Sequence, residues 1–265
     1  MSEALLRTRI SVDYPHRPRV LGDVELEIRQ GEIAGLVGES GSGKSTFALA
    51  VLGLLGRKNA RVRGSILYRG QDLLAYREHQ MRRVRGREIG VVLQSAASSL
   101  NPRLRLGTQL REAWLAHGSQ SWEHARRSVM QLLEELELPA NDDFLRRFPS
   151  QVSVGQAQRI LIAMAVMHKP PLLIADEPTS ALDMVTRAEV LRLFAGLNRQ
   201  WNTTILYISH DLLSVASLCQ SVSILKQGEI VESGSCEHIF QRPAHSYTKT
   251  LIGSLPRLDL DACAV

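Results

Sequence analysis

The sequence predicts an α/β fold: a core on a mostly parallel sheet, a flanking antiparallel β-subdomain and an inserted α-helical subdomain. Three observations predict it. Short segments of alternating polarity, such as residues 24–28 and 65–68, occur in the first seventy positions and are typical of half-exposed strands. From about residue 95 to 149 the apolar residues recur at helical spacing. After residue 149, helical and apolar strand-like segments alternate, as in a parallel α/β core.

The individual elements follow from local patterns. Residues 32–37 and 89–93 are short apolar runs that predict buried strands, and residues 46–55 predict a helix. The helical stretch predicts helices at 108–117 and 122–138. The remaining elements, in chain order, are a helix at 157–168, a strand at 172–175, a helix at 184–201 and strands at 204–209, 222–226 and 229–232. We therefore expect one domain over 1–265, a helical subdomain at 95–165 within it, and a short helical C-terminal extension at 235–265.

Composition excludes several classes of protein. With 265 residues, 44% of them hydrophobic, the chain can bury a substantial core. It has no apolar run of 18 residues and no apolar N-terminal segment, so we expect neither a membrane span nor a signal peptide, and we expect a cytoplasmic location. Cys219, Cys236 and Cys263 are too few and too widely spaced for a disulfide framework.

The net charge is +5, and its densest cluster has no aromatic residues interleaved for stacking on bases. The cluster consists of Arg82, Arg83, Arg85 and Arg87. We interpret it as solvated surface or a docking surface and expect no nucleic-acid partner.

Residues 38–45, GESGSGKS, carry the strongest chemical signal. They fit G-x-x-x-x-G-K-[ST] and lie between a predicted strand and a predicted helix. Such a loop directs backbone N–H groups and the positive end of a helix dipole at one anion. Lys44 would reach the β and γ phosphates, and the Ser45 hydroxyl would hold Mg²⁺. The fold class is therefore an α/β P-loop NTPase core that binds a nucleotide.

Two adjacent carboxylates, Asp176 and Glu177, end the apolar strand at 172–175. Open α/β sheets bind ligands at the carboxyl ends of their strands. If this strand lies beside the phosphate-loop strand, Asp176 can coordinate the Mg²⁺ and Glu177 can polarise an attacking water. The alternative is that the two carboxylates only cap a strand before Pro178.

Further segments follow the phosphate loop in the order and spacing of an ABC-type ATPase, which the chain resembles over nearly its whole length. They are Gln94, residues 152–156, Asp176 and Glu177, residues 180–183, and His210. The resemblance implies a two-lobed nucleotide-binding domain that hydrolyses ATP with Mg²⁺. It implies that Gln94 touches the metal or the water, that His210 donates to the γ-phosphate, and that Tyr14 stacks on adenine. The residues it assigns to ATP are Gly38, Glu39, Ser40, Gly41, Ser42, Gly43, Lys44, Ser45, Thr46, Tyr14, Ser153, Gly155 and Gln156, and those it assigns to the metal are Ser45, Gln94 and Asp176.

In this family the segment that Ser153, Gly155 and Gln156 belong to completes the site of an opposite subunit. The resemblance therefore implies a second ABC ATPase subunit paired head to tail, in a homodimer or a heterodimer. The usual pattern is L-S-G-G-Q, and this chain has Val152 for Leu and Val154 for the first Gly. A β-branched residue tolerates positive φ poorly. Either Val154 has ordinary dihedral angles, or the loop requires positive φ and the site it forms is slow.

Two segments narrow the resemblance to the dipeptide, oligopeptide and nickel importer ATPases. They are residues 99–102, SLNP, followed by Gln109 and Glu112, and residues 245–251, HSYTKTL, followed by Pro256. Ser246 replaces a proline of the family pattern. The resemblance implies an integral membrane permease and, indirectly, an external substrate-binding protein as partners, with the chain peripheral on the inner face of the cell membrane. We expect no iron–sulfur cluster, because only Cys263 lies in the tail.

Two alternatives stay open. One is a cytoplasmic ABC ATPase of a non-transport complex, such as carbon–phosphorus lyase-like machinery. The other is a poorly hydrolytic partner that binds ATP to hold a complex together. The presence of Lys44, Asp176, Glu177 and His210 weighs against the second.

Overall fold

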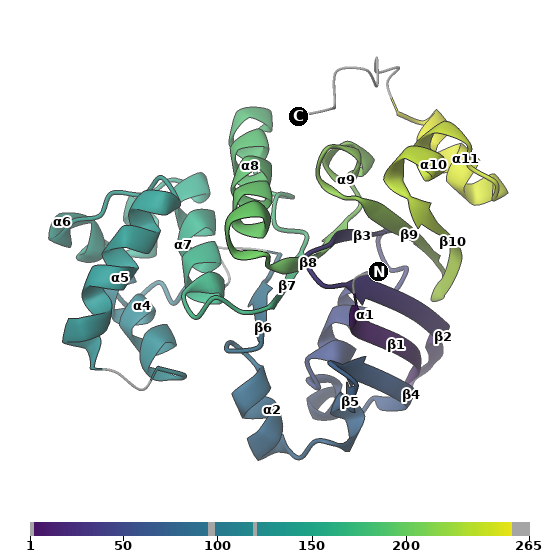
Figure 1. Cartoon of the computed structure of the whole chain (residues 1–265), viewed down its shortest axis with the longest axis horizontal. Coiled ribbons are helices and arrows are strands. Elements are labelled where there is room, and N and C mark those ends of the chain that lie inside the picture. Colours follow the sequence, from purple (N-terminus) through teal and green to yellow (C-terminus); the bar gives the residue numbers. More distant parts are fainter. Residues whose placement is uncertain (1–2, 95–98, 119–120, 256–265) are drawn as a thin grey trace.

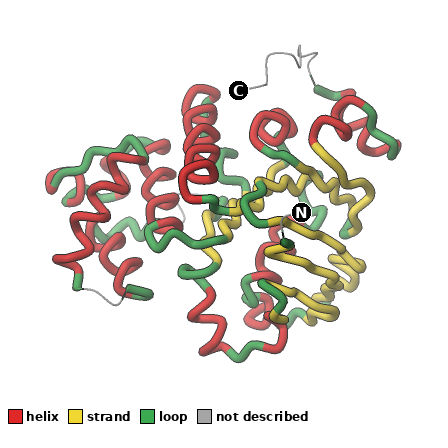
Figure 2. Tube along the Cα trace, viewed as in Figure 1, coloured by secondary structure: helices red, strands yellow, loops and turns green. Residues whose placement is uncertain are grey.

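The computed structural model describes residues 3–94, 99–118 and 121–255, which form two sheets and a set of helices around them. Figures 1 and 2 show the antiparallel sheet on one side, the helices α4 to α7 on the other, and the larger sheet running between them. The larger sheet contains six strands in the order β10-β9-β3-β8-β7-β6. Within it only β10 is antiparallel to its neighbour.

The central strands of the larger sheet have sequences that suit burial on both faces. Every residue of β3, β7 and β8 is buried. Parallel strands with layers on both faces read as continuous apolar runs. The six strands are β3 (Ile33–Val37), β6 (Ile89–Val92), β7 (Leu172–Asp176), β8 (Thr204–Ser209), β9 (Ser221–Lys226) and β10 (Glu229–Ser235).

The register of this sheet positions the site. Val37 pairs with Ser209, and Asp176 pairs with Ile208. The carboxyl ends of β3, β7 and β8 therefore lie at one edge of the sheet, and the loops that follow them meet there.

The smaller sheet has the order β2-β1-β4-β5 and is antiparallel throughout. Burial alternates along β1, where Leu6, Thr8 and Ile10 face inward and Arg7 and Arg9 face outward. This alternation is what a half-exposed antiparallel strand requires. The strands are β1 (Ala4–Tyr14), β2 (Arg17–Arg29), β4 (Arg61–Tyr68) and β5 (Gln71–Asp72).

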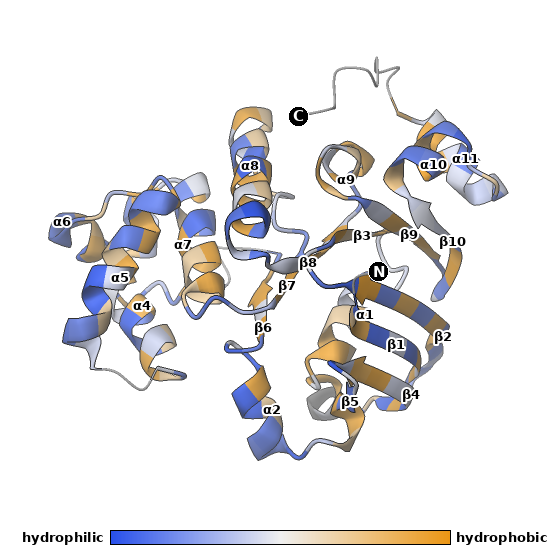
Figure 3. Cartoon of the chain, viewed as in Figure 1, coloured by the Kyte–Doolittle hydropathy of each residue, from blue (hydrophilic) through white to orange (hydrophobic). Residues whose placement is uncertain are grey.

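The helices cover both faces of the larger sheet and form the region between β6 and β7. Figure 3 shows β6 and β7 in hydrophobic colours, whereas the outer helices α5 and α6 contain many hydrophilic residues. The α-helices are α1 (Lys44–Val51), α2 (Glu78–Val84), α4 (Leu106–Leu115), α5 (Trp122–Glu135), α6 (Asp142–Leu145), α7 (Val154–Val166), α8 (Met184–Trp201), α9 (Leu212–Leu218), α10 (Cys236–Gln241) and α11 (Ser246–Gly253). Short 3-10 helices lie at η1 (Leu55–Lys58), η2 (Leu73–Ala75) and η3 (Pro149–Gln151).

Two hydrophobic cores lie on opposite faces of the larger sheet. One joins the smaller sheet and α1 to the sheet residues Leu36 and Ile174. The other joins the helices α4 to α7 to Leu173 and Tyr207, and it continues into α10 and α11. Because the helical region shares a core with the sheet, its division as a subdomain at 95–165 stays a prediction, as does an extension at 235–265.

Several predicted elements have the expected bounds, and others differ for local physical reasons. The helix at 184–201 and the strand at 204–209 are as predicted. The helix expected at 46–55 begins earlier, at Lys44, because Gly43 adopts φ 113° at the N-cap and turns the chain into the helix. The helix expected at 157–168 begins at Val154, because a capping box precedes it.

The two short helices α2 and α9 were not predicted at all. Each spans seven residues, too short for a helical period to stand out in the sequence. None of the described helices combines the length and the apolar character that a membrane span requires. Cys219 and Cys236 are buried free thiols, and Cys263 lies outside the described residues.

Candidate active site

The loop between β3 and α1 has a conformation that a phosphate-binding loop needs. Gly41 and Gly43 have φ 81° and 113°, in the region that favours glycine. A Cβ atom on Gly38 would lie 2.1 Å from the Leu225 carbonyl oxygen, so the loop passes too close to β9 for any side chain. The backbone N–H of Gly228, in the β9–β10 hairpin, donates to the Ser42 carbonyl at 2.9 Å. The hairpin thus supports the loop from one side.

Lys44 is folded back over this loop. Its ammonium donates to the carbonyl oxygens of Gly38 at 2.7 Å and Glu39 at 3.1 Å. Burial lowers the pKa of Lys44, while the carboxylates of Glu177 and Asp176 act in the opposite sense. A buried ammonium with two neutral acceptors and nearby carboxylates is a point charge positioned for an anion such as a phosphate.

Asp176 ends β7 and lies beside the start of α1. It is buried, and burial raises the pKa of its carboxyl group, partly offset by a hydrogen bond from the Ser45 hydroxyl. Within the described part of the chain, Asp176 Oδ1 has no hydrogen-bond partner. A buried carboxylate oxygen without a donor, next to a hydroxyl, fits a hard cation that prefers oxygen ligands. Asp176 and Ser45 are therefore suited to hold Mg²⁺.

Glu177 follows directly and has φ 51°, a left-handed conformation that costs a non-glycine residue free energy. Its backbone N–H donates to the Ile208 carbonyl at 2.9 Å, which holds it against the end of β8. Both carboxylate oxygens lie 2.8 Å from His210 Nδ1, and one lies 3.9 Å from Lys44 Nζ. The tertiary structure thus brings Glu177, His210 and Lys44 together at the edge where β3, β7 and β8 end.

Other predicted residues lie around this cluster or apart from it. The Tyr14 hydroxyl, at the end of β1, lies 3.5 Å from the Thr46 hydroxyl and so stands beside the phosphate loop. Gln94 follows β6 and is exposed, and residues 95–98 after it lie outside the described residues. Ser153, Gly155 and Gln156 form the start of α7. No hydrogen bond or ion pair between described residues joins these three to the phosphate loop.

The start of α7 presents donors outward. The Ser153 hydroxyl accepts from the Gln156 N–H at 3.1 Å, and the Gln156 side chain accepts from the Ser153 N–H at 3.2 Å. Ser153 is exposed and Gln156 is half-buried. Gly155 packs against α8, since a Cβ there would lie 2.7 Å from the Thr186 methyl group. A helix N-terminus with an exposed serine can donate to an anion brought by another molecule.

Val154 is the first residue of α7 and is 57% exposed. Its backbone is helical, so the reading in which the residue is strained by a positive φ is wrong. Val154 has ordinary helical dihedral angles, as the other interpretation expects, because the Ser153 cap starts the helix at this residue.

We expect Val154→Gly to change ATP turnover by less than about twofold, because the exposed side chain strains nothing, and to lower stability by up to roughly 1 kcal/mol because glycine weakens a helix. Steady-state ATPase assays and thermal unfolding check both values. Val185→Gly, an exposed valine in the first turn of α8, is the matched control. A severalfold faster Val154→Gly variant would restore the idea of a slow site.

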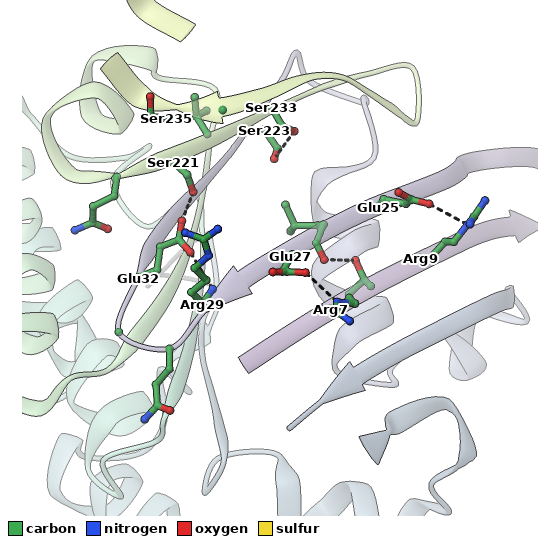
Figure 4. A pocket seen from close by; sticks show the side chains of 17 residues that line it. Arg7, Arg9, Glu25, Glu27, Arg29, Glu32, Ser221, Ser223, Ser233 and Ser235 are labelled. Carbon is green, nitrogen blue, oxygen red and sulfur yellow. Dashed lines mark hydrogen bonds and ion pairs between the residues drawn. The ribbon is translucent and has the colours of Figure 1, made fainter. Parts of the chain in front are cut away.

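A hollow of about 1040 Å³ lies elsewhere, between β1, β2 and the β9–β10 pair. Figure 4 shows its charged side chains turned toward one another. Arg7 pairs with Glu27 at 2.9 Å and Arg9 with Glu25 at 3.1 Å. Paired charges leave little positive potential for a phosphate, so we assign the nucleotide to the loop edge instead.

A model of the family described as ABC transporter matches residues 21–180, and one described as Oligopeptide/dipeptide transporter, C-terminal region, matches residues 231–263. The chain is 38% identical over 241 residues to the oligopeptide transport ATP-binding protein OppD of Escherichia coli (strain K12), covering 91% of this chain and 71% of that protein. It is 41% identical over 239 residues to the dipeptide transport ATP-binding protein DppD of Bacillus subtilis (strain 168), covering 90% and 71%.

Solved structures agree with the fold. A dimeric ATP-binding cassette in a post-hydrolysis state, bound to ADP and Pi, matches with a TM-score of 0.75 and 27% identity, over 88% of this chain and 99% of that one. The protein cbiO1 from Clostridium perfringens matches with a TM-score of 0.79 at 22% identity, over 91% and 92% of the two chains. The predicted α/β fold with a P-loop core is confirmed.

Proposed function

This chain belongs to the ABC transporter family, and from that premise we propose that it is the ATP-hydrolysing motor subunit of an importer whose cargo is peptides. The observation that carries the proposal is the cluster of Lys44, Asp176, Glu177 and His210 at the phosphate loop, in a chain similar to peptide transport ATP-binding proteins. The match of residues 231–263 to the oligopeptide/dipeptide transporter C-terminal region supports the peptide class. Nickel-type cargo was also expected from the sequence, but the relatives reported above are named for peptides.

The chemistry follows from the charges in the site. The loop N–H groups and Lys44 bind the β and γ phosphates of ATP, and Tyr14 stacks on adenine. Ser45 and Asp176 would hold Mg²⁺, with Gln94 as a neutral ligand or water contact, and the bound metal would supply positive charge against the phosphate oxygens. Glu177 orients and deprotonates the attacking water. His210 holds the Glu177 carboxylate in place and donates to the γ-phosphate.

A second ABC ATPase subunit completes the site. In the described structure Ser153 and the N-terminus of α7 are exposed. They donate hydrogen bonds to the γ-phosphate bound by the opposite subunit, and the same segment of the opposite subunit donates to the ATP bound by this chain. The dimeric cassette among the similar structures supports such pairing. The pair is a homodimer if the second subunit is a copy of this chain and a heterodimer if it is a different chain.

The remaining partners are an integral membrane permease and, through it, an external substrate-binding protein. The permease docks on the surface around Gln94 and the helices α4 and α5, so that ATP binding moves its helices. The chain then lies on the inner face of the cell membrane. The two relatives OppD and DppD are transport ATP-binding proteins, which favours an importer over a non-transport complex such as carbon–phosphorus lyase-like machinery.

Purification from membranes tests this proposal. The tagged chain is recovered from detergent-solubilised membranes of its own cell, and its partners are identified by mass spectrometry. We expect a polytopic permease and a second ABC ATPase subunit in the same complex, with ATPase activity that rises when peptide-loaded binding protein is added. Recovery only in a complex without membrane proteins would contradict the importer.

A further inference from the structure

One arginine in the first turn of α8, Arg187, connects two segments of the site that follow different strands. Its Nη1 atom donates to the Asp211 carboxylate at 2.9 Å, and its Nη2 atom donates to the Leu182 carbonyl at 3.4 Å. Leu182 lies in the turn between β7 and α8, and Asp211 directly follows His210 after β8. The helices α8 and α9 lie next to each other beyond these strands (Figure 1). Arg187 therefore joins the chain after β7 to the chain after β8.

The ion pair between Arg187 and Asp211 has a defined geometry. The two side chains are 34% and 21% exposed, so solvent screens the pair less than a pair on the open surface. Asp211 is held from its other side by α9, because its carboxylate accepts from the Leu213 N–H at 3.1 Å and the Ser214 hydroxyl at 2.6 Å. The position of Asp211 is thus set by α8 and α9 together.

The backbone on both sides of His210 is held. Ser209 ends β8 and pairs with Val37 of β3, and its hydroxyl accepts from the Asp211 N–H at 2.9 Å. The His210 side chain itself is 55% exposed, and its ring contacts the Glu177 carboxylate. Because more than half of the side chain has no protein around it, the place of the ring depends on the backbone at 209–211.

The contacts around the site form a closed ring. The Glu177 carbonyl accepts from the Ser180 N–H at 3.3 Å and from the Ser180 hydroxyl at 3.1 Å, which ties Glu177 to the turn before α8. The same turn is tied to Arg187, which pairs with Asp211. His210, the neighbour of Asp211, contacts Glu177 again. Members of such a network restrain one another, so the loss of one link loosens the others.

We propose that Arg187 is a positioning residue for ATP hydrolysis. The Leu182 carbonyl orients its guanidinium, and Asp211 transmits that position to His210, which is thereby held at the Glu177 carboxylate. This inference rests on the proposed ATPase function. It gives Arg187 a part in the hydrolytic step and none in nucleotide binding, because neither of its two contacts belongs to the phosphate loop.

The variant Arg187→Gln tests the proposal, because glutamine removes the charge and is too short to keep the ion pair. We expect kcat for ATP to fall by about 5-fold to 20-fold, since a small displacement of a catalytic group is costly. The Kd and KM for Mg·ATP should stay within about twofold of the wild type. Binding is measured by calorimetry on the purified full chain, and kcat on the assembled transporter.

The variant Arg187→Lys should lie between the other two proteins. Lysine keeps the ion pair with Asp211 but lacks the planar fork that also reaches Leu182, so we expect a loss of about twofold to threefold in kcat. Because the charge stays paired, this variant also tests the proposal where the glutamine variant does not fold. A lysine variant no more active than the glutamine variant would contradict the role of the ion pair.

Removal of the His210 ring separates positioning from a general structural role. In a His210→Ala background, Arg187→Gln and Arg187→Lys should change the single-turnover rate by less than about 1.5-fold, since no ring is left to position. A loss as large as in the wild-type background would overturn the proposal, because Arg187 would then act without His210.

Arg192→Gln is the matched control, because Arg192 is an exposed arginine further along the same helix. It should keep the wild-type kcat and Kd. An Arg187→Gln variant with kcat within twofold of the wild type, or with a Kd that rises as much as kcat falls, would overturn the proposal. Either result would leave the motor function intact as long as the wild type hydrolyses ATP. Absence of ATPase activity in the wild-type complex would instead refute the motor function.

Discussion

Glu177→Gln is expected to bind Mg·ATP with an affinity within about threefold of the wild type and to lose at least roughly 100-fold in kcat. Glutamine has the same shape and can adopt the same position, but its amide cannot accept a proton from water. The carboxylate it replaces is buried and lies 2.8 Å from His210 Nδ1 and 3.9 Å from Lys44 Nζ. The variant also loses one of the two negative charges that offset the buried Lys44 ammonium. The positive charge that remains favours binding of a phosphate there.

The measurement is single-turnover hydrolysis of radiolabelled ATP together with equilibrium binding. Glu88→Gln is the matched control, because Glu88 makes an ion pair with Arg69 at 3.1 Å on a different side of the molecule. The control should hydrolyse ATP at the wild-type rate. Turnover by Glu177→Gln within threefold of the wild type would rule out Glu177 as the base.

Asp176→Asn is expected to have opposite effects on the free protein and on the Mg·ATP complex. Without nucleotide the variant should unfold at a higher temperature near neutral pH, because burial disfavours the Asp176 carboxylate and raises its pKa. With Mg·ATP at 100 times the wild-type Kd, the free energy of unfolding of the wild type should rise by about 2.7 kcal/mol. That of the variant should rise by almost nothing, since a neutral amide is a poor Mg²⁺ ligand.

The pH dependence identifies the cause. A carboxyl group whose pKa is raised on folding contributes stability below its unfolded pKa, and that contribution is lost as the pH rises through the folded pKa. The difference in the free energy of unfolding between Asp176→Asn and the wild type should therefore widen as the pH rises across that window. Asp142→Asn, an exposed carboxylate paired with Arg126, should show neither effect. A variant that is stabilised by Mg·ATP as strongly as the wild type would show that Asp176 holds no metal.

Much of the site could be predicted because its motifs are contiguous. The glycines of residues 38–43 permit a loop that other residues cannot form, and Lys44 and Ser45 follow at once. Asp176 and Glu177 end an apolar strand, and strand ends carry ligands in this class of sheet. These patterns depend on local backbone chemistry, which a sequence displays directly.

Other features could not be predicted because they depend on partners distant in the chain. The pairing of Glu177 with His210 requires β7 and β8 to be neighbours. The support of the loop by Gly228 and the approach of Tyr247 to Glu39 had no signal in the sequence, where residues 245–251 only indicated the subfamily.

The residues alone identify an α/β fold with a phosphate loop and two strand-end carboxylates, and the resemblance they carry adds the ABC family and its signature segment. Each is a short run whose chemistry is read from its own residues. Packing in three dimensions brings Lys44, Glu177 and His210 to one sheet edge, leaves Val154 unstrained and places the C-terminal helix beside the loop at Glu39. The physical reason is that register, helix start and side-chain contact are properties of the packed chain, set by which strands pair and which caps form.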